Sequence, residues 1–407
     1  MIDIKNLRTN PEAYKQSATL RGITADIDAL IKADQERITL AAQVDELRAQ
    51  LNVKGKPSAD DLKQLQEAKA KLEPLERKLT KLTEHYQDLL QAVPNLIADG
   101  TPEGGEEANA PEKTWGEAKK TDAKDHLTLG EANGWIDFEK GAQVAGSKFY
   151  YLKGPVLRFE LALMQYVLQK LEQAEMTGMI TPHMVNNRIL EATGFQPRGE
   201  EDQVYRIEGE DLTLIGTAEI PLTGYHADEI IDPDRLPLAY VGLTPAYRKE
   251  AGAYGKHSKG LYRVHQFDKL EMYVFCKPED SEEWHQKLLA IEEEIYQELE
   301  IPYRVVRIAA GDLGAPAYKK YDLEYWSPVD GAYREITSCS NCTDYQARRL
   351  NIRTRDANGK PVAVHTLNGT AVAFSRVFIA LLENHQTKEG AVQIPAVLQP
   401  LYGSKTL

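Results

Sequence analysis

The sequence predicts an α+β chain in two parts, a long antiparallel coiled-coil hairpin and a domain built on an antiparallel β-sheet flanked by helices. Two N-terminal stretches carry apolar residues at alternating spacings of three and four, the period of a coiled coil. A segment rich in proline and glycine follows them. Beyond it, short apolar strands are joined mostly by turns with few helices between them, which is typical of an antiparallel sheet.

Length, charge and cysteine content limit the class of protein. With 407 residues and 42% hydrophobic content, the chain is long enough for two domains. No apolar run approaches the ~18 residues of a membrane span, and the first residues lack the apolar core of a signal peptide. Three cysteines give no disulfide framework. We therefore expect a cytoplasmic protein with no membrane partner. Because the net charge is -13, the surface is not generally basic, and any nucleic acid must bind at a local basic patch.

We expect an N-terminal domain over residues 1–100. Asn10-Pro11 predicts a short helix to about Thr19. An antiparallel arm then covers about 25–93, because the break at 52–58 is too short to do more than reverse the chain. Pro74, inside the second helix, is expected to kink it or to remove hydrogen bonding. The first predicted seam consists of Leu30, Ala33, Leu40, Val44, Leu47 and Leu51, and the charged Arg37 occupies one seam position where an apolar residue is expected. The second predicted seam consists of Leu65, Ala68, Leu72, Leu75, Leu79, Leu82, Tyr86, Leu89 and Val93.

The arm is locally basic in a chain that is acidic overall. Between Arg48 and Lys81 the sequence has nine lysines and arginines against five acidic residues. One interpretation is a rod that presents positive charge to phosphates. The alternative is an ordinary solvated helix face.

Residues 101–113 are predicted to be a linker, because 94–113 carry three prolines, three glycines and little apolar content. The second domain then covers 114–407. Its expected helices lie at 157–174, 279–299 and 370–385, and residues 177–182 are expected to be extended. Its expected strands lie at 211–216, 238–244, 261–275, 303–309 and 333–338.

Residues 245–275 are predicted to form a hairpin whose open end carries the side chains of a functional site. A period of two places Arg263, His265, Phe267, Lys269 and Glu271 on one face of the second strand, with Val264, Leu270, Met272 and Val274 mainly on the other. Arg248 and Glu250 share a face of the first strand by the same rule. If these two faces lie on the same side of the hairpin, their charged and aromatic side chains together suit the binding of a nucleotide and a small zwitterion. The alternative is an edge hairpin with a solvated polar face.

The common phosphate-binding fingerprints are absent from the sequence. No G-x-G occurs, and Gly255-Lys256 lacks the upstream glycine that a P-loop needs. What remains is a series of separated pieces: Thr217-Ala218-Glu219, Arg248-Lys249-Glu250, Phe267 with Glu271, Glu335-Ile336-Thr337-Ser338, and Asn368-Gly369-Thr370 leading to Arg376.

These pieces, in this order, resemble the motifs of the bacterial-type seryl-tRNA synthetases, a family of class II aminoacyl-tRNA synthetases. Residues 157–182 resemble the first class II motif, 247–275 the second and 367–384 the third. Residues 126–131, 263–268 and 335–344 resemble this family rather than class II in general. The resemblance covers essentially the whole chain and is weakest in the arm.

The resemblance implies an enzyme, a serine–tRNA ligase with a C-terminal class II catalytic domain and an N-terminal domain that binds tRNA. Such an enzyme activates L-serine with ATP to seryl-adenylate and pyrophosphate. It then transfers serine to tRNA(Ser), and also to tRNA(Sec), with release of AMP. The first motif implies a homodimer.

The resemblance also assigns the site residues. Catalytic roles fall on Arg248, Glu335 and Arg376, and Glu335 with Ser338 would hold the Mg²⁺ that accompanies ATP. Phe267 would stack on adenine and Glu250 would contact its amino group. The implied ATP site is Arg248, Lys249, Glu250, Val264, Phe267, Glu335, Ile336, Thr337, Ser338 and Arg376. The implied serine pocket is Thr217, Ala218, Glu219, Arg248, Glu271, Asn368 and Thr370, with Glu271 toward the ammonium or hydroxyl group.

Physical chemistry supports these assignments. Serine's carboxylate must attack a phosphate, and the fork of an arginine such as Arg248 can bind both anions at once. No general base is required, because the carboxylate is already ionised. A pocket that hydrogen-bonds the serine hydroxyl can reject alanine without an editing domain.

The sequence departs from the family at a few positions. Gly216 stands where proline usually precedes the Thr-Ala-Glu piece, and Ser375 stands where glycine usually precedes the arginine of the third motif. The loop 254–260 is also atypical, and we expect it to meet the tRNA. Cys339-x-x-Cys342 is a single pair, so buried thiols are expected there and no structural zinc.

Two other functions account for parts of the sequence. A synthetase-like enzyme that loads a protein carrier would lack the long helical hairpin. A non-catalytic coiled-coil protein would not need Arg248, Glu271, Glu335 and Arg376 together.

Overall fold

The computed structural model describes residues 2–52, 59–194, 203–250, 259–387 and 390–407. The chain divides into two compact units, Met1–Leu96 and Ile97–Leu407. The end of the predicted linker differs from the structure, because residues 110–113 belong to strand β1 (Ala110–Trp115), which pairs with β9 (Tyr303–Arg307). Most side chains of β1 are exposed, so this edge strand lacks the apolar pattern by which a strand is predicted.

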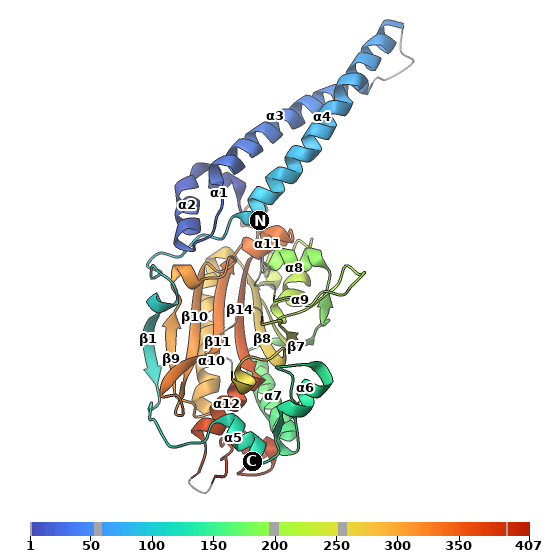
Figure 1. Ribbon diagram of the computed structural model, residues 1–407. Coiled ribbons are helices and arrows are strands. Elements are labelled where there is room, and N and C mark those ends of the chain that lie inside the picture. Colours follow the sequence, from blue (N-terminus) through green and yellow to red (C-terminus); the bar gives the residue numbers. More distant parts are fainter. Residues whose placement is uncertain (1, 53–58, 195–202, 251–258, 388–389) are drawn as a thin grey trace. The chain divides into compact units, whose positions relative to one another are not determined.

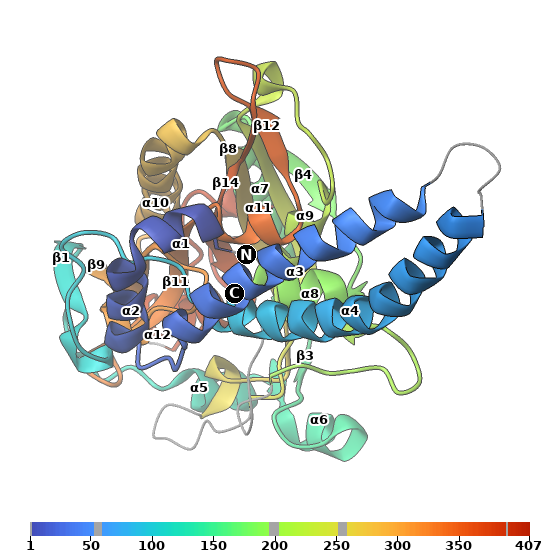
Figure 2. The same ribbon diagram turned by 90° about the horizontal axis from the view of Figure 1, so that it is seen from above.

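The first unit is helical, as predicted. It contains α1 (Ile4–Thr9), α2 (Pro11–Leu20), α3 (Ile27–Leu51) and α4 (Ala59–Ala92). Figures 1 and 2 both show α3 and α4 side by side as an antiparallel pair. Helix α4 continues through Pro74. The predicted turn at the tip falls on residues 53–58, outside the described residues.

The seam between α3 and α4 follows the prediction. The fully buried apolar side chains in this region are Leu30, Ala33, Leu40, Val44, Ala68, Tyr86, Leu90 and Val93. The other predicted seam leucines, Leu89 among them, are partly buried, and Leu90 was not predicted. The charged Arg37 lies over the ring of Tyr86 at 4.7 Å and binds the buried Asp34 at 3.0 Å, where Arg8 also pairs.

The second unit is built on an eight-stranded sheet in the order β1-β9-β10-β11-β14-β8-β7-β4 (Figure 1). Every pairing is antiparallel except that of β4 with β7. The remaining strands of this sheet are β4 (Thr177–Ile180), β7 (Leu238–Tyr247), β8 (Gln266–Cys276), β10 (Lys319–Ser327), β11 (Ala332–Thr343) and β14 (His365–Ala373). Strand β8 lies between β14 and β7, so the alternative of an edge hairpin is wrong.

Helices cover both faces of this sheet. They are α5 (His126–Ala132), α6 (Phe138–Ala145), α7 (Pro155–Gln173), α8 (Asn187–Thr193), α9 (Glu219–Gly224), α10 (Ser281–Glu298), α11 (Tyr345–Arg349), α12 (Phe374–Asn384) and α13 (Gln399–Tyr402). Two-stranded pairs complete the unit: β2 (Ile136–Asp137) with β3 (Tyr151–Leu152), β5 (Met184–Val185) with β6 (Thr213–Leu214), and β12 (Arg353–Arg355) with β13 (Pro361–Ala363). The helix expected at 370–385 begins at Phe374, because residues 370–373 end β14.

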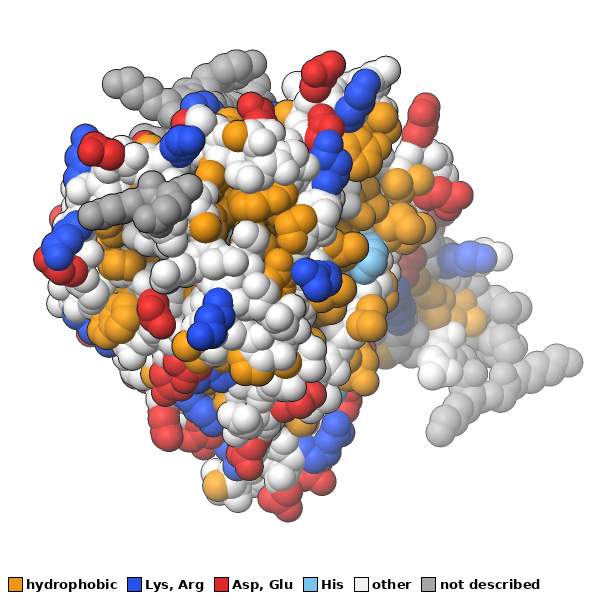
Figure 3. Space-filling view, turned by 90° about the horizontal axis from the view of Figure 1, so that it is seen from below, with side chains coloured by type: hydrophobic (Ala, Val, Ile, Leu, Met, Phe, Trp, Pro, Cys, Tyr) orange, Lys and Arg blue, Asp and Glu red, His pale blue; other side chains and the backbone are white. Residues whose placement is uncertain are grey.

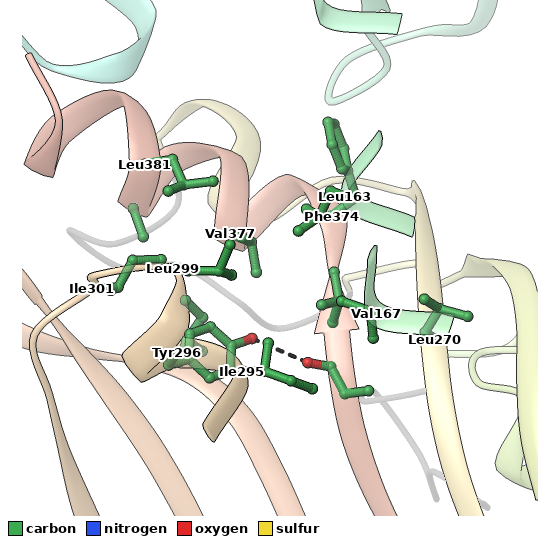
Figure 4. Close-up of a cluster of buried hydrophobic side chains, with 14 of the residues drawn as sticks. Leu163, Val167, Leu270, Ile295, Tyr296, Leu299, Ile301, Phe374, Val377 and Leu381 are labelled. Atoms are coloured by element: carbon green, nitrogen blue, oxygen red, sulfur yellow. Dashed lines mark hydrogen bonds between the residues drawn. The ribbon is translucent and has the colours of Figure 1, made fainter. Parts of the chain in front are cut away.

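Strand β8 separates two apolar clusters, as its alternation predicts. Met272 and Val274 pack with α7, α10 and α12, and Figure 4 shows the part of this cluster around Tyr296, whose hydroxyl donates to the carbonyl of Ala371. Tyr273 and Phe275 pack on the other face with α8, α9 and α11. The face that carries Tyr273 also carries Phe267, Lys269 and Glu271, so the second cluster and the polar stretch share one side of the strand.

Strand β14 is packed tightly at Gly369. A Cβ atom there would lie 2.9 Å from Glu292 Oε1 on α10 and 3.0 Å from Met272 Cε on β8. A larger residue there would need these two side-chain ends to move, and no left-handed backbone angle calls for glycine at this position. No helix of the described residues is long and apolar enough to cross a membrane.

Candidate active site

A cleft opens on the sheet where β8, β10, β11 and β14 meet the starts of α9 and α12. Polar and charged side chains make up most of its lining. Twelve of the predicted site residues line it: Thr217, Glu219, Arg248, Phe267, Glu271, Glu335, Ile336, Thr337, Ser338, Asn368, Thr370 and Arg376. Lys269, Lys320 and Ala373 line it as well and were not predicted as site residues.

Four predicted residues lie outside this lining. Ala218 is buried in the apolar cluster beneath α9, and Val264 is 2% exposed. Glu250 binds Arg263 at 3.1 Å, and the backbone N–H of Lys249 donates to the carbonyl of Gln203. Strand β7 ends at Tyr247, so alternation along the strand no longer places the side chains that follow.

One end of the cleft holds two arginines. Burial and then the charge of Arg376 lower the pKa of Arg248, whose Nε donates to the carbonyl of Gly216 at 3.2 Å. Arg376 binds Glu335 at 2.8 Å. Burial alone would raise the pKa of Glu335, but the charges of Arg376 and Lys320 outweigh it and lower that pKa to about 2. Two guanidinium groups beside a permanently ionised carboxylate form a site for a polyanion and its counter-ion.

Aromatic rings support both guanidinium groups. The centre of the Arg248 guanidinium lies 5.4 Å from the ring centroid of Phe267, and that of Arg376 lies 4.8 Å from the centroid of Tyr262. The Tyr262 hydroxyl donates to the carbonyl of Glu335 at 3.0 Å. Such stacking holds a planar cation in one orientation.

The other end of the cleft holds two carboxylates with different partners. Glu271 binds Lys269 at 2.5 Å and accepts a hydrogen bond from Thr370 at 3.1 Å. Both members of this pair are buried. Burial lowers the pKa of Lys269, although Glu271 opposes this. Glu271 is therefore a carboxylate whose charge already has a cation.

Glu219 is held by neutral amides instead. Gln346 Nε2 and Asn368 Nδ2 donate to Glu219 Oε1 at 2.7 and 3.1 Å. Among the described residues, no ion pair reaches Glu219. Burial and then the charge of Glu271 raise its pKa to about 7. This carboxylate is suited to a cation that the ligand brings.

The residues that were missed differ in the signal they left. Lys269 was placed on the polar face of β8 by its alternation, so its position was predicted but its place in the site was not. Lys320 lies on β10, a strand that the pattern did not predict. Gln346 lies on the short helix α11, and nothing in its local sequence marks it.

Cys339 and Cys342 contact different elements. Cys339 Sγ donates to the carbonyl of His285 on α10, whereas Cys342 Sγ accepts from Asn368, which lines the cleft. Both cysteines, like Cys276, are buried free thiols. Within the described ranges, no three histidine, cysteine or acidic side chains gather as metal ligands.

The comparisons with known proteins agree with this geometry. Residues 1–97 match the seryl-tRNA synthetase N-terminal domain, and residues 203–385 match the tRNA synthetase class II core domain (G, H, P, S and T). The chain is 47% identical to a serine–tRNA ligase from Dictyoglomus turgidum, over 99% of this chain and 98% of that protein. It is 44% identical to one from Rubrobacter xylanophilus, over 100% and 99%.

Solved structures give the same result. Seryl-tRNA synthetase from Pyrococcus horikoshii, complexed with ATP, is 41% identical and superposes with a TM-score of 0.92 over 100% of this chain and 99% of that one. Cytoplasmic serine–tRNA ligase from Naegleria fowleri, in complex with AMP, is 32% identical with a TM-score of 0.85, over 98% and 95%. The chain therefore belongs to the seryl-tRNA synthetase family, within the class II aminoacyl-tRNA synthetases.

Proposed function

We propose that this protein activates L-serine with ATP and transfers the serine to tRNA(Ser), with release of pyrophosphate and AMP. The observation that carries the proposal is the division of one cleft into an end with two supported arginines and an end with a carboxylate that no protein cation neutralises. ATP fits the first end and the ammonium group of an amino acid fits the second.

The activation step joins two anions. A carboxylate oxygen of serine forms a bond to the α-phosphorus of ATP, and the bond from that phosphorus to the bridging oxygen breaks, so that pyrophosphate leaves with the electron pair. Arg248, between Phe267 and the carboxylate end, is placed to bind both anions. Each charge-assisted hydrogen bond contributes about 1.5–3 kcal/mol. Arg376 binds the leaving phosphates, and Phe267 stacks on the adenine ring.

The residues at the phosphate end suit Mg²⁺. Glu335 and Ser338 both line that end, and their carboxylate and hydroxyl oxygens are donors that Mg²⁺ prefers. Two protein donors are enough for an ion that takes its other ligands from phosphates and water. When bound, the ion would neutralise phosphate charge. Glu335, whose pKa is about 2, is ionised and ready for it at any physiological pH.

Serine is recognised at its two polar groups. Its ammonium group binds Glu219, and its hydroxyl donates to Glu271 beside Thr370. Glu271 takes the hydroxyl because Lys269 already neutralises its charge. Alanine lacks this hydroxyl and would leave empty the acceptor position of Glu271 that the hydroxyl fills, and the loss of such a bond can reduce kcat/KM by about 10⁴-fold.

Exchange of labelled pyrophosphate into ATP tests this first step. We expect exchange that depends on serine and is abolished by Arg248→Ala. Arg188→Ala is the matched control, because Arg188 forms only an exposed ion pair with Asp228. Exchange with alanine or threonine, and none with serine, would refute the assignment.

The N-terminal arm is proposed to bind the tRNA, since residues 1–97 match the N-terminal domain of this family. Deleting residues 30–90 is expected to leave serine activation intact and to abolish charging of tRNA(Ser). The charging assay also includes tRNA(Sec), which the family resemblance implies as a second substrate. Equal loss of activation and charging would contradict this division of labour. The loop proposed to meet the acceptor end lies mostly outside the described residues.

We propose that the protein is a cytoplasmic homodimer with α7 at its interface. Leu157 and Leu161 of α7 are 59% and 58% exposed, and Ile180 of β4 is 84% exposed. Figure 3 shows that apolar side chains also reach the lower surface of the molecule. Large exposed apolar side chains on neighbouring elements are typical of a protein interface. Sedimentation equilibrium that gives the mass of one chain would contradict this proposal.

A further inference from the structure

A buried amide lies directly behind Glu219 and outside the cleft lining. Gln346 is 0% exposed. Its Nε2 donates to Glu219 Oε1 at 2.7 Å and to the carbonyl of Thr193 at 3.1 Å. Its Oε1 accepts from the hydroxyls of Tyr273 and Thr366, both at 2.8 Å. Every hydrogen-bonding group of this amide therefore has a partner.

This network fixes which way the amide points. The oxygen of a glutamine can only accept and its nitrogen can only donate, and the two hydroxyls hold the oxygen away from Glu219. The nitrogen must then face the carboxylate. Tyr273 is itself held by Thr223, whose hydroxyl donates to the tyrosine oxygen at 2.7 Å. The orientation is thus determined by elements on either side of α11, and a buried network of this kind is rigid when all its members are satisfied.

We infer that Gln346 is a positioning residue that orients Glu219 by a hydrogen bond to its carboxylate, so that the carboxylate can receive the ammonium group of serine. This inference rests on the proposed function. Asn368, the other donor to Glu219, lines the cleft and is placed to touch the substrate itself. Gln346 acts only through Glu219.

The charges around Glu219 show why an extra donor matters. Glu271, on β8, faces it with a like charge, and Lys269 on the same strand and Arg248 after β7 face it with opposite charges. Asn368 on β14 and Gln346 on α11 contribute neutral donors. Burial and Glu271 raise the pKa of Glu219 to about 7, and the Gln346 hydrogen bond acts against this rise. Without that bond the pKa of Glu219 would be higher still, so that a smaller fraction of the carboxyl group would be ionised and able to pair with an ammonium group at neutral pH.

Two variants of the full-length protein test the inference by pyrophosphate exchange between pH 6 and 9. Gln346→Glu keeps the shape but places a second carboxyl group beside Glu219. Gln346→Met keeps the volume and removes the donor without adding charge. Gln297→Glu is the matched control, because Gln297 is a partly buried glutamine on α10 that donates to the Tyr303 hydroxyl and does not line the cleft.

We expect the KM for serine to rise about 10–100-fold in both variants at pH 7, as the loss of one hydrogen bond to a charged group implies. The pH at which kcat/KM for serine reaches half its maximum should move upward, further in Gln346→Glu than in Gln346→Met. The KM for ATP should stay unchanged. Gln297→Glu should match the wild type in all three quantities.

A purely structural role gives a different result. It would lower the melting temperature and the active fraction, and so reduce kcat for both substrates without moving the pH midpoint. That outcome, or a pH midpoint unchanged in whichever variant folds, overturns the inference. If neither variant folds, Thr366→Val, which removes one of the two hydroxyls that hold the Gln346 oxygen, is measured in the same way, and a wild-type KM for serine and pH midpoint in that variant overturn the inference. Failure of the proposed function is distinguishable, because the wild type itself would then show no serine-dependent exchange.

Discussion

Two carboxylates that line opposite ends of the cleft are built differently. Glu335 lies against Arg376, so that protein cations lower its pKa to about 2. Glu219 accepts hydrogen bonds from two amides, and burial and the charge of Glu271 outweigh the more distant charges of Lys269 and Arg248 and raise its pKa to about 7. This difference indicates the charge of the ligand group that each end of the cleft suits. The phosphate end supplies its own cations for an anionic ligand, whereas the serine end leaves a negative charge for a cationic one.

The largest expected effect comes from removing a cation at the phosphate end. Arg376→Ala should lower kcat/KM for ATP about 10²–10⁴-fold, because it removes charge-assisted bonds of ~1.5–3 kcal/mol each to the phosphates. The KM for serine should change much less. Initial rates of exchange, with each substrate varied in turn, measure both. Equal losses for ATP and serine would show that the two ends are not independent.

A second change tests whether Glu271 needs its cation. Lys269→Met leaves Glu271 buried and unpaired, which should lower the free energy of unfolding by about 3–5 kcal/mol. The double variant Lys269→Met with Glu271→Gln should recover much of this loss, because no buried charge remains. Denaturant titration of both proteins measures the difference. If the double variant is no more stable than Lys269→Met, then Lys269 stabilises the fold by packing rather than by pairing.

A smaller effect is expected at the serine end. Glu219→Gln keeps the shape and removes the charge that receives the ammonium group, so the KM for serine should rise about 10–100-fold with the KM for ATP unchanged. Thr354→Val removes a buried hydroxyl that donates to the carbonyl of Ile231 outside the cleft lining, and it serves as a comparison for general loosening of the core. A Glu219→Gln enzyme with a normal KM for serine would place the ammonium group elsewhere.

The smallest effect is on stability, and its sign follows from the direction of the pKa shift. The folded protein holds the Glu219 proton up to about pH 7, whereas the unfolded chain releases it near the ordinary value of ~4.3. This residue therefore makes the fold less stable as pH rises between these two values, and by a constant amount above them. Glu219→Gln should raise the melting temperature by a few degrees at pH 8 and by little at pH 4.5. A larger gain at the lower pH would contradict the raised pKa.

Short motifs that resemble those of a known family were enough to predict most of the cleft, and most of their residues lie within β8, β11 and β14 and on α12. Phe267 and Glu271 could be placed on one face of β8 by counting alone. Glu250 and Val264 were also assigned to the ATP site, yet they lie outside the cleft lining because they fall between β7 and β8, where alternation does not apply.

Contacts between elements far apart in sequence could not be predicted in the same way. The Gln346–Glu219 hydrogen bond joins residues 127 positions apart, and no periodicity of α11 points to it. The full burial of Leu90 in the arm was missed for a similar reason, because the heptad count selects its neighbour Leu89 and does not show what packs around the end of α4. Strand β1 was missed because an exposed edge strand has no apolar pattern.

The tight packing at Gly369 has a consequence for any substitution at this position. This residue separates Asn368 and Thr370, which line the cleft, and its own missing side chain faces Glu292 and Met272 on the opposite side of the sheet. A methyl group at position 369 would meet the far ends of these two side chains, which would have to move to make room for it. The first effect of such a change would therefore fall on Glu292, which accepts a hydrogen bond from the cleft residue Thr337, rather than on the backbone of β14.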